Sequence, residues 1–340
     1  MLKVGIIGLG TISYIHHLAI EATGLAEIVA VCDINPATQN DYPDLPFYTD
    51  MEEMLDQENL DVVHICLPHY LHVPAAKTCI DHGVHVYLEK PLAMSYQEGR
   101  ELADYVESHD SKVAVSFQNR YNKTSQELHH RLKKLVSEDN GRVLMVKGIV
   151  TWFRPESYYE AEPWRGRWDQ AGGGTIANQS IHTLDLMQWF TGQELVASKG
   201  KLIQLTDYAI EVEDTATADF TFTNDVHGIY YATNAYQENS TVLVEVVTNE
   251  GRYVISDNAL YYYADKYGQG HLICQDDIFP SSKSYYGMGH KLAIQALYEA
   301  IINNNEDYIS VADALPSMMM IDLLKQSSQS NQKVNAKELL

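Results

Sequence analysis

Short apolar runs alternate with helix-like stretches through the first 120 residues of the chain. The runs are Val4–Ile7, Ile28–Cys32, Val62–Leu67, His85–Leu88 and Val113–Phe117, and helical patterns near 13–22, 49–56, 72–82 and 96–109 separate them. Unbroken apolar runs are typical of strands covered on both faces, and the alternation with helices favours a parallel sheet with crossover helices. We therefore predict an α/β domain of the doubly wound Rossmann type over residues 1–121.

The pattern changes after Tyr121. A helix-like stretch at 125–136 and a strand-like run at 143–151 lead to a predicted helix near 175–191, which ends at Gly192. Residues 195–280 contain period-two or β-branched runs, with the hairpin signal TNEG at 248–251, and helical patterns near 288–303 and 311–328 follow. We predict an α+β domain over residues 122–340 with a large open, mainly antiparallel sheet, and a frayed polar tail after Ser327.

Composition narrows the choice of partners. A chain of 340 residues suits two domains, and 46 acidic against 24 basic residues give a formal net charge of -22. Such a surface repels phosphate backbones and anionic lipids, so we expect neither a nucleic acid nor a membrane partner. With no leader pattern and no apolar stretch long enough to span a membrane, the sequence favours a cytoplasmic protein.

The four cysteines give no sign of a metal centre. Cys32, Cys66, Cys79 and Cys274 form no CxxC pair and lack zinc-ligand spacing. Cys32 and Cys66 fall within strand-like runs, where a thiol behaves as a small hydrophobic group. The adjacent His16 and His17 also lack the spacing and partners of a metal site, so we predict no metal.

A glycine-containing turn follows the first apolar run, in GIIGLGTISYIHH at residues 5–17. Gly8 allows a tight turn, Gly10 lets the backbone approach a pyrophosphate, and the next helix offers unpaired N–H groups at its start, around Thr11 and Ile12. Ser13 replaces the usual third glycine and is small enough for close helix packing. Asp33, at the end of the second run, can accept hydrogen bonds from ribose hydroxyls and would repel a 2′-phosphate, so we predict NAD rather than NADP.

A second motif makes a family resemblance specific. In HGVHVYLEKPLAMS, residues 82–95, Lys90 follows a strand directly and precedes Pro91. Together with GLGTISYIHH, this segment resembles the Gfo/Idh/MocA family of nicotinamide-dependent sugar and cyclitol oxidoreductases. The resemblance implies that Lys90 lies near substrate and nicotinamide, and that the peptide before Pro91 is cis.

The block WRGRWDQAGGGTIANQSIHTLDLMQWFTG, residues 164–192, resembles the glycine-rich entry to the family's catalytic helix. Spacings of four, three and four place Asn178, His182, Asp185 and Trp189 on one predicted helical face. The resemblance implies that His182 is an acid/base group or a substrate ligand. Asn178 stands where the family often has aspartate, which weakens a His–Asp relay and shifts the acid/base role toward Lys90.

These arguments give a set of candidate site residues. The candidate catalytic residues are Lys90 and His182, and the candidate substrate-binding residues are Asn178, Asp185, Arg165 and Tyr158. The candidate cofactor-binding residues are Gly8, Gly10, Thr11, Ile12, Asp33, Leu67, Pro68, His72, Glu89, Lys90, Gln118, Trp164 and Arg165. Further positions considered for the cofactor edge or the substrate pocket are Asn119, Arg120, Tyr159, Tyr285, Tyr286 and His290.

Several of these residues have an ordinary structural alternative. Asp185 could be a buried hydrogen-bonding group, His72 could cap its helix, and Arg165 could form a surface salt bridge. The sequence leaves these alternatives open.

The resemblance implies hydride transfer between NAD(H) and a hydroxyl or carbonyl carbon of a small polyhydroxylated substrate, such as a sugar, a sugar derivative or an inositol. Three alternatives stay open: an NAD-dependent glycosidase acting by transient oxidation, a dihydrodiol or bilin-type reductase, and a non-catalytic nucleotide-sensing regulator. The presence of both Lys90 and His182 argues against the regulator. The resemblance also implies a homodimer or homotetramer formed through the C-terminal sheet.

Overall fold

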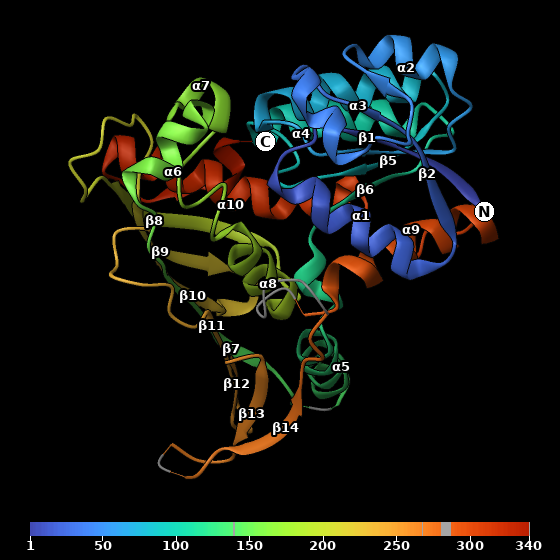
Figure 1. The fold of residues 1–340 in the computed structure, drawn as a ribbon. Helices are drawn as coiled ribbons and strands as arrows, with labels where there is room; N and C mark the ends of the chain where they lie inside the picture. The colour runs from blue at the N-terminus through green and yellow to red at the C-terminus, as the bar shows by residue number, and fades with distance from the viewer. Residues whose placement is uncertain (139, 267, 280–286, 340) are drawn as a thin grey trace. The chain divides into compact units, whose positions relative to one another are not determined.

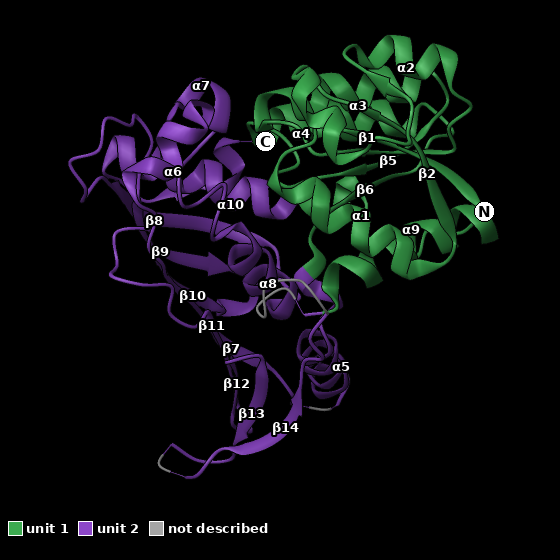
Figure 2. Ribbon diagram, in the orientation of Figure 1, with its two compact units in different colours: residues 1–118, 288–315 green, residues 119–287, 316–340 purple. Residues whose placement is uncertain are grey.

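The computed structural model describes residues 1–138, 140–266, 268–279 and 287–339. The chain divides into two compact units (Figure 2). Unit 1 combines Met1–Gln118 with Met288–Leu315, and unit 2 combines Asn119–Gly287 with Pro316–Leu340. The sequence pattern put residues 288–315 in the second domain, whereas the structure packs them within unit 1.

Unit 1 contains a six-stranded parallel sheet with the strand order β3-β2-β1-β4-β5-β6. Its strands are β1 (Leu2–Ile7), β2 (Ala26–Cys32), β3 (Phe47–Tyr48), β4 (Val62–Ile65), β5 (His85–Leu88) and β6 (Val113–Val115). From β1 the chain adds β2 and β3 on one side of the sheet and then adds β4, β5 and β6 on the other side. In open α/β sheets, ligands bind beyond the carboxyl ends of the strands at the point between two such halves, here between β1 and β4. The predicted Rossmann sheet is therefore confirmed, with the short β3 as an addition.

Unit 1 also contains α-helices, some of which begin or end at capping residues. They are α1 (Thr11–Thr23), α2 (Met51–Gln57), α3 (His72–Asp81), α4 (Tyr96–Glu107) and α9 (Gly289–Asn303). The side chains of Asp50 and Ser95 accept backbone N–H bonds at the starts of α2 and α4, and Gly24 ends α1 in the left-handed conformation. Helix α9 packs against α1, and Ala114 in β6 pairs with Ser310, which explains why the late segment belongs to unit 1.

Unit 2 contains a nine-stranded sheet with the order β14-β13-β12-β11-β7-β10-β9-β8-β15 (Figure 1). Its strands are β7 (Val143–Thr151), β8 (Leu195–Ile203), β9 (Thr215–Phe222), β10 (His227–Thr233), β11 (Leu243–Thr248), β12 (Arg252–Ser256), β13 (Ala259–Tyr263), β14 (His271–Gln275) and β15 (Val334–Asn335). The β7–β10 pair is parallel and the other pairs are antiparallel. This confirms the predicted mainly antiparallel sheet and the hairpin after Thr248.

One face of this sheet is covered by helices of unit 2. These helices are α5 (Lys123–Ser137), α6 (Glu156–Ala161), α7 (Trp168–Ala171), α8 (Ile181–Thr191) and most of α10 (Val311–Ser330), within which the unit boundary falls. The register aligns Gly200, Ala218, Tyr230 and Gly148 across four strands on the same face. A Cβ at Gly148 would lie 2.5 Å from the sulfur of Met187 in α8, and one at Gly200 would lie 2.3 Å from Leu324 in α10. Glycine thus lets both helices approach the sheet closely.

Two local predictions were wrong. The predicted helix near 175–191 begins at Ile181, and residues 175–180 form a turn with hydrogen bonds from Asn178 N to Gly174 O and from Ser180 N to Thr175 O. The tail after Ser327 is ordered, because Val334 in β15 pairs with Ser198 in β8 and the Ser327 hydroxyl donates to Gln332 O. A short 3-10 turn, Ala336–Glu338, follows.

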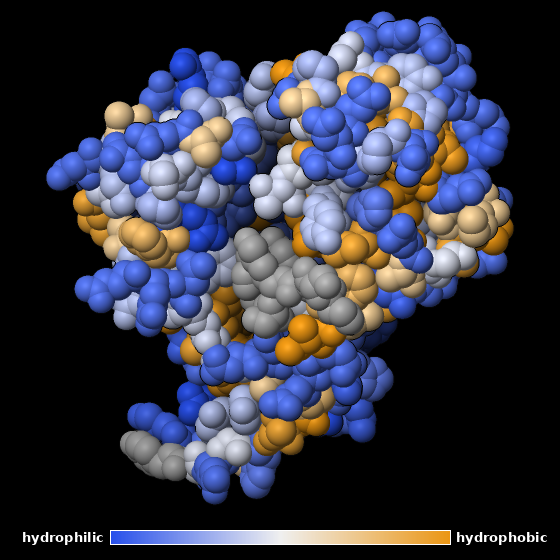
Figure 3. Space-filling view, viewed as in Figure 1, coloured by the Kyte–Doolittle hydropathy of each residue, from blue (hydrophilic) through white to orange (hydrophobic). Residues whose placement is uncertain are grey.

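The surface agrees with the composition. Hydrophilic residues predominate on the face shown in Figure 3. Within the described part of the chain, no helix combines the length and the apolar character needed to cross a bilayer.

Candidate active site

The first candidate element is the turn between β1 and α1 in unit 1. Gly8 has a φ of +87°, and a Cβ there would lie 2.7 Å from the carbonyl oxygen of Cys66, so only glycine fits. A Cβ at Gly10 would meet no atom within 4 Å, so the protein leaves open space beside this residue. Ser13 is buried and its hydroxyl donates to Gly10 O at 2.7 Å. The departure from the third glycine therefore adds a hydrogen bond that holds the turn.

Asp33 directly follows β2 and lies against the same turn. Its carboxylate accepts a hydrogen bond from the backbone N–H of Leu9 at 2.7 Å and another from Asn35 N at 2.8 Å. The half-buried side chain thus fixes a negative charge beside the glycines. Open space at Gly10, the exposed Thr11 and half-buried Ile12 at the start of α1, and this carboxylate fit the diphosphate and ribose of a dinucleotide.

The EKP segment lies at the carboxyl end of β5. The peptide between Lys90 and Pro91 is cis, as the resemblance implied. Lys90 is half-buried, whereas Glu89 is 5% exposed and its carboxylate accepts hydrogen bonds from His16 Nε2 at 3.0 Å and from Lys90 N at 3.2 Å. Glu89 was a candidate cofactor contact, but these bonds direct its carboxylate into the unit.

His72 has a similar inward position. It is fully buried, and its ring nitrogens lie 2.7 Å from Pro91 O and 2.8 Å from Leu67 O. Burial lowers the pKa of this imidazole. These contacts favour a role in holding the EKP segment beside the loop after β4, rather than the nicotinamide ribose contact considered from the sequence. Leu67 and Pro68 are half-buried in that loop, and Gln118 is buried after β6.

In unit 2, the glycine-rich turn before α8 is held by a buried glutamate. Glu213 is 3% exposed and accepts hydrogen bonds from Gly174 N at 2.9 Å and Ile176 N at 3.0 Å. A Cβ at Gly174 would lie 1.8 Å from Glu213 O, so glycine is required there. Burial raises the pKa of Glu213 to about 7, against the effect of the two N–H bonds. This carboxyl group positions the turn that carries Asn178.

Three of the predicted substrate residues, Tyr158, Asn178 and Arg165, lie close together beside that turn. The Tyr158 hydroxyl accepts hydrogen bonds from Asn178 Nδ2 at 2.9 Å and Gln179 Nε2 at 3.0 Å. The guanidinium of Arg165 lies 4.4 Å from the centre of the Tyr158 ring, and that of Arg154 lies 5.5 Å from it. Two guanidinium groups near one tyrosine ring, with an amide bonded to its hydroxyl, bring several hydrogen-bond donors together for an oxygen-rich ligand.

Asp185 lies elsewhere, in the interior of unit 2. Asp185 is 1% exposed. Its carboxylate accepts hydrogen bonds from Arg120 Nε at 2.8 Å, from Arg120 Nη2 at 2.6 Å and from the Ser317 hydroxyl at 3.0 Å. Trp189, one turn further along α8, contacts the same guanidinium and stacks on His129. The buried hydrogen-bonding alternative therefore describes Asp185 better than substrate binding, and the salt bridge explains why Arg120 is buried.

The other candidates are scattered. His182 is half-buried as the second residue of α8, and Trp164 donates its indole N–H to Glu162 at 3.0 Å. Tyr159 is buried beside Asn234, and Asn119 is half-buried in a 3-10 turn. His290 is buried at the start of α9 in unit 1. Tyr285 and Tyr286 lie outside the described residues.

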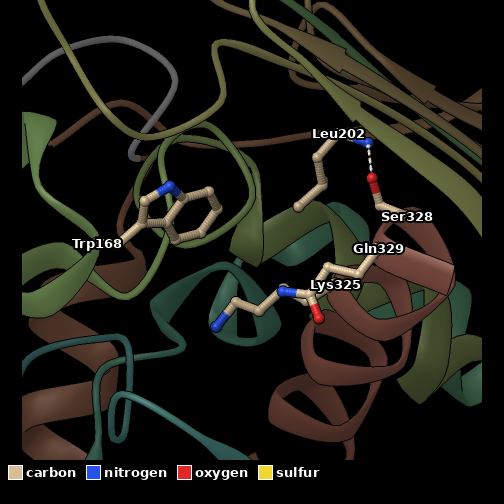
Figure 4. Close-up of a pocket in the computed structure, with 5 residues that line it drawn as sticks. All are labelled: Trp168, Leu202, Lys325, Ser328 and Gln329. Atoms are coloured by element: carbon tan, nitrogen blue, oxygen red, sulfur yellow. Dashed lines mark hydrogen bonds between the residues drawn. The ribbon is translucent and has the colours of Figure 1, made fainter.

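A cavity of about 290 Å³ in unit 2 is separate from these groups. Trp168, Leu202, Lys325, Ser328 and Gln329 line it, and the Ser328 hydroxyl accepts a hydrogen bond from Leu202 N (Figure 4). Its lining contains none of the predicted site residues. Among the described residues, no cluster of three His, Cys, Asp or Glu side chains could hold a metal ion.

Comparison with known families agrees with this geometry. Residues 2–117 match the oxidoreductase family with an NAD-binding Rossmann fold, and residues 129–254 match the Gfo/Idh/MocA C-terminal domain. The chain belongs to the Gfo/Idh/MocA family. Its first 117 residues thus include an NAD-binding domain.

Individual relatives are distant. The rhizopine catabolism protein MocA of Rhizobium meliloti is 25% identical over 194 residues, which are 56% of this chain and 58% of that protein. D-glucoside 3-dehydrogenase of Escherichia coli strain K12 is 27% identical over 206 residues, which are 58% of this chain and 56% of that protein. The matches therefore span less than two thirds of the length of these relatives.

Similarity in structure extends further. The WlbA dehydrogenase of Chromobacterium violaceum, solved with NADH and UDP-GlcNAcA, superimposes with a TM-score of 0.85 at 25% identity. The match covers 98% of this chain and 95% of that one. The fold of the whole chain is thus that of a family dehydrogenase.

Two positioning residues were missed from the sequence, His16 and Glu213. The HH pair at 16–17 was considered only as a metal site, and Glu213 stands in the unremarkable run EVEDT. The one signal of burial for Glu213 was its position between the apolar Val212 and the strand-like run that begins at Thr215. Nothing local indicates which segments these side chains contact.

Replacing Asp33 should weaken discrimination between the two dinucleotides. The native protein should bind NADH more tightly than NADPH, because the fixed carboxylate repels a 2′-phosphate. In Asp33→Ser, fluorescence titration should show the ratio of the two dissociation constants falling by about tenfold or more, or ~1.4 kcal/mol. Asp33→Asn is the companion variant, because it removes the charge and retains one oxygen for Leu9 N, while the position that accepts from Asn35 N becomes an amide NH₂. Tighter binding of NADPH by the native protein would refute this interpretation of Asp33.

Glu213 should make stability depend on pH. Because the folded state raises the pKa of this carboxyl group from 4.5 to about 7, folding retains its proton better than the unfolded chain does. Its contribution is present below pH 4.5 and is lost as pH rises through about 7, by roughly 3 kcal/mol at most. Denaturant unfolding between pH 5 and 8.5 should show this fall in the native protein and a flatter profile in Glu213→Gln. The exposed Glu211→Gln is the control, and parallel profiles for the native protein and Glu213→Gln would contradict the prediction.

Proposed function

We propose that this protein is an oxidoreductase that transfers a hydride between NAD(H) and a hydroxyl or carbonyl carbon of a small polyhydroxylated substrate. A sugar, a sugar derivative or an inositol is the substrate class. The observation that carries the proposal is the position of Lys90, a basic side chain at the carboxyl end of β5 in the unit whose β1–α1 turn accommodates a dinucleotide. The sugar-related names of relatives, D-glucoside 3-dehydrogenase among them, support the substrate class.

Each group has a defined chemical task. Bound NAD⁺ would supply the hydride acceptor. Oxidation of an alcohol also releases the hydroxyl proton, which the neutral Lys90 amine accepts as general base. In the reverse direction the Lys90 ammonium returns that proton to the carbonyl oxygen. Tyr158, Asn178 and Arg165 bind substrate oxygens, and His182 donates or accepts a hydrogen bond at the substrate.

A panel of sugars and inositols tests the substrate class. We expect NADH formation with at least one member when the full chain is incubated with NAD⁺, followed by its absorbance. Nitrophenyl glycosides are assayed in parallel. Release of nitrophenol without net NADH formation would replace this proposal with the glycosidase alternative.

Lys90 should matter more to the chemical step than His182. Lys90→Met removes the general acid–base group and should lower kcat by roughly 10²–10⁴, with NADH binding nearly unchanged. His182→Ala should act mainly on KM, because Asn178, which stands where the family often has aspartate, cannot take a proton from this imidazole. Steady-state kinetics on one substrate and an NADH fluorescence titration measure both effects. Near-native kcat in Lys90→Met, with loss of turnover in His182→Ala, would reverse these roles.

We also infer that the protein forms a homodimer or homotetramer through the unit 2 sheet. The face opposite the helices carries Met145 and Ile149 on β7 and Ile229 and Tyr231 on β10. Ile149 pairs with Tyr231, whereas Met145 pairs with His227 and Ile229 with Lys147. Met145 is 37% and Ile229 43% exposed, although both belong to central strands of the sheet. Exposed apolar side chains on central strands are typical of an interface.

Light scattering at micromolar concentration tests the assembly. We expect the mass of a dimer or tetramer for the native protein, and a shift toward the monomer for Ile229→Lys, which replaces an exposed apolar side chain of this face with a charge. Val136→Lys, at an exposed position of α5, is the control for an added charge outside the sheet. A monomeric native protein would contradict the inference.

A further inference from the structure

A continuous chain of buried polar side chains ends at the residue before Lys90. His16 Nε2 lies 3.0 Å from Glu89 Oε1, His16 Nδ1 lies 2.9 Å from His64 Nδ1, and His64 Nε2 lies 2.8 Å from the Tyr298 hydroxyl. The four residues come from α1, β4, the end of β5 and α9, all within unit 1. His16, His64 and Tyr298 are each 0% exposed. The chain is therefore shielded from water along its length.

Hydrogen-bond counting determines the direction of this chain. An ionised Glu89 can only accept, so His16 carries a proton on Nε2. With His16 neutral, its Nδ1 accepts from His64 Nδ1–H, which leaves His64 Nε2 to accept from the hydroxyl of Tyr298. The Cys66 thiol, 3.4 Å from His16 Nδ1, also lies beside that acceptor. Every donor in the chain then points toward the Glu89 carboxylate.

The opposite arrangement leaves a polar group unsatisfied. A doubly protonated His16 would donate to His64 Nδ1, and His64 Nε2–H would then donate to the Tyr298 oxygen. Within the described residues the Tyr298 hydroxyl has no other acceptor for its proton, and an unsatisfied buried donor is costly. Burial also holds the pKa of His64 well below its ordinary value. A neutral His16 and a neutral His64 satisfy all the contacts.

We propose that Tyr298, His64 and His16 hold Glu89 as a buried anion, whose charge keeps the neighbouring Lys90 protonated near neutral pH. This inference rests on the proposed role of Lys90 and adds His16 and Glu89 as positioning residues that act through it. Oxidation of the substrate requires the neutral Lys90 amine, and reduction requires the Lys90 ammonium. The hydrogen-bonded side chains from Tyr298 to Glu89 therefore favour the form of Lys90 that donates a proton.

The charges around Glu89 support this arrangement. Burial opposes its ionised form, but the hydrogen bond from His16 and the charge of Lys90 act in the other direction, and the pKa of Glu89 lies below the usual range. The titratable groups that interact with Glu89 are His16, His64, Cys66, His72, Lys90 and His290. Tyr87 contacts the ring of His16, and Tyr298 bonds to His64. Burial lowers the pKa of His290 to about 3 and also lowers that of His72, and it raises the pKa of the Cys66 thiol. The positive charge of Lys90 thus stabilises the ionised form of Glu89.

The first measurement needs no substrate. In the full-length protein labelled with ¹⁵N-histidine, long-range proton–nitrogen correlation spectra distinguish the tautomers, and His16→Gln assigns the His16 signals. Between pH 6 and 9 we expect His16 protonated on Nε2 alone and His64 on Nδ1 alone. Protons on both nitrogens of His16 would overturn the proposal.

The second measurement follows Lys90 itself. Competitive labelling with trace acetic anhydride, analysed by mass spectrometry, gives the pH at which Lys90 becomes reactive. In Glu89→Gln this midpoint should fall by about one pH unit, the lower end of the effect of a nearby opposite charge. The exposed Lys3 is the internal reference, and His17→Gln, on the exposed side of α1 beside Glu21, is the matched control. An unchanged Lys90 midpoint in folded Glu89→Gln would overturn the proposal.

A third variant covers the case in which Glu89→Gln does not fold. Tyr298→Phe removes only the terminal hydroxyl, so the His64 Nε2 resonance should move toward that of an unbonded imidazole nitrogen. An unchanged His64 Nε2 resonance would contradict the hydrogen bond from Tyr298 and overturn the proposal. None of these measurements uses NAD or a sugar, so failure of the proposed function would appear separately as absence of turnover.

Discussion

The cost of burying a carboxylate determines the local structure around Glu89 in unit 1 and around Asp185 and Glu213 in unit 2. An ionised carboxylate in the interior must be hydrogen-bonded on both oxygens or lose its charge. Glu89 is held by His16 and its own neighbouring N–H, Asp185 by Arg120 and Ser317, and Glu213 by two N–H groups of the glycine turn. Except for the bond from the neighbouring N–H to Glu89, these bonds join segments distant in sequence and so fix loops that secondary structure alone does not hold.

The three carboxylates meet this requirement in different ways. Asp185 has a bidentate guanidinium partner, which keeps its charge compensated and anchors α8. Glu89 has neutral imidazole donors and the charge of Lys90 beside it. Glu213 has only backbone dipoles at close range, and burial therefore raises its pKa to about 7. Unit 1 thus holds Glu89 beside Lys90, whereas unit 2 contains Asp185, whose charge is compensated by Arg120, and Glu213, whose pKa is raised to about 7.

Much of the fold could be predicted from local pattern. The strands Val143–Thr151 and His85–Leu88 begin and end where the apolar runs do, because buried strands are uniform in character and turns interrupt them. The start of α8 could not be predicted, because residues 175–180 have helical composition but are held as a turn by contacts with Glu213. Asp185 was ambiguous for the same reason, since its partners lie 65 and 132 residues away. Motif position located the candidate residues, whereas long-range contacts decided which side chains face inward.

The return of residues 288–315 to unit 1 has a consequence for biosynthesis. The ribosome releases residues 1–118 long before α9 exists, so the nascent Rossmann sheet emerges with the α9-facing side of α1 uncovered. The hydrogen-bond partner of His64, Tyr298, is also synthesised more than 230 residues after it. Both units are therefore completed late in synthesis, unit 1 by residues 288–315 and unit 2 by residues 316–340.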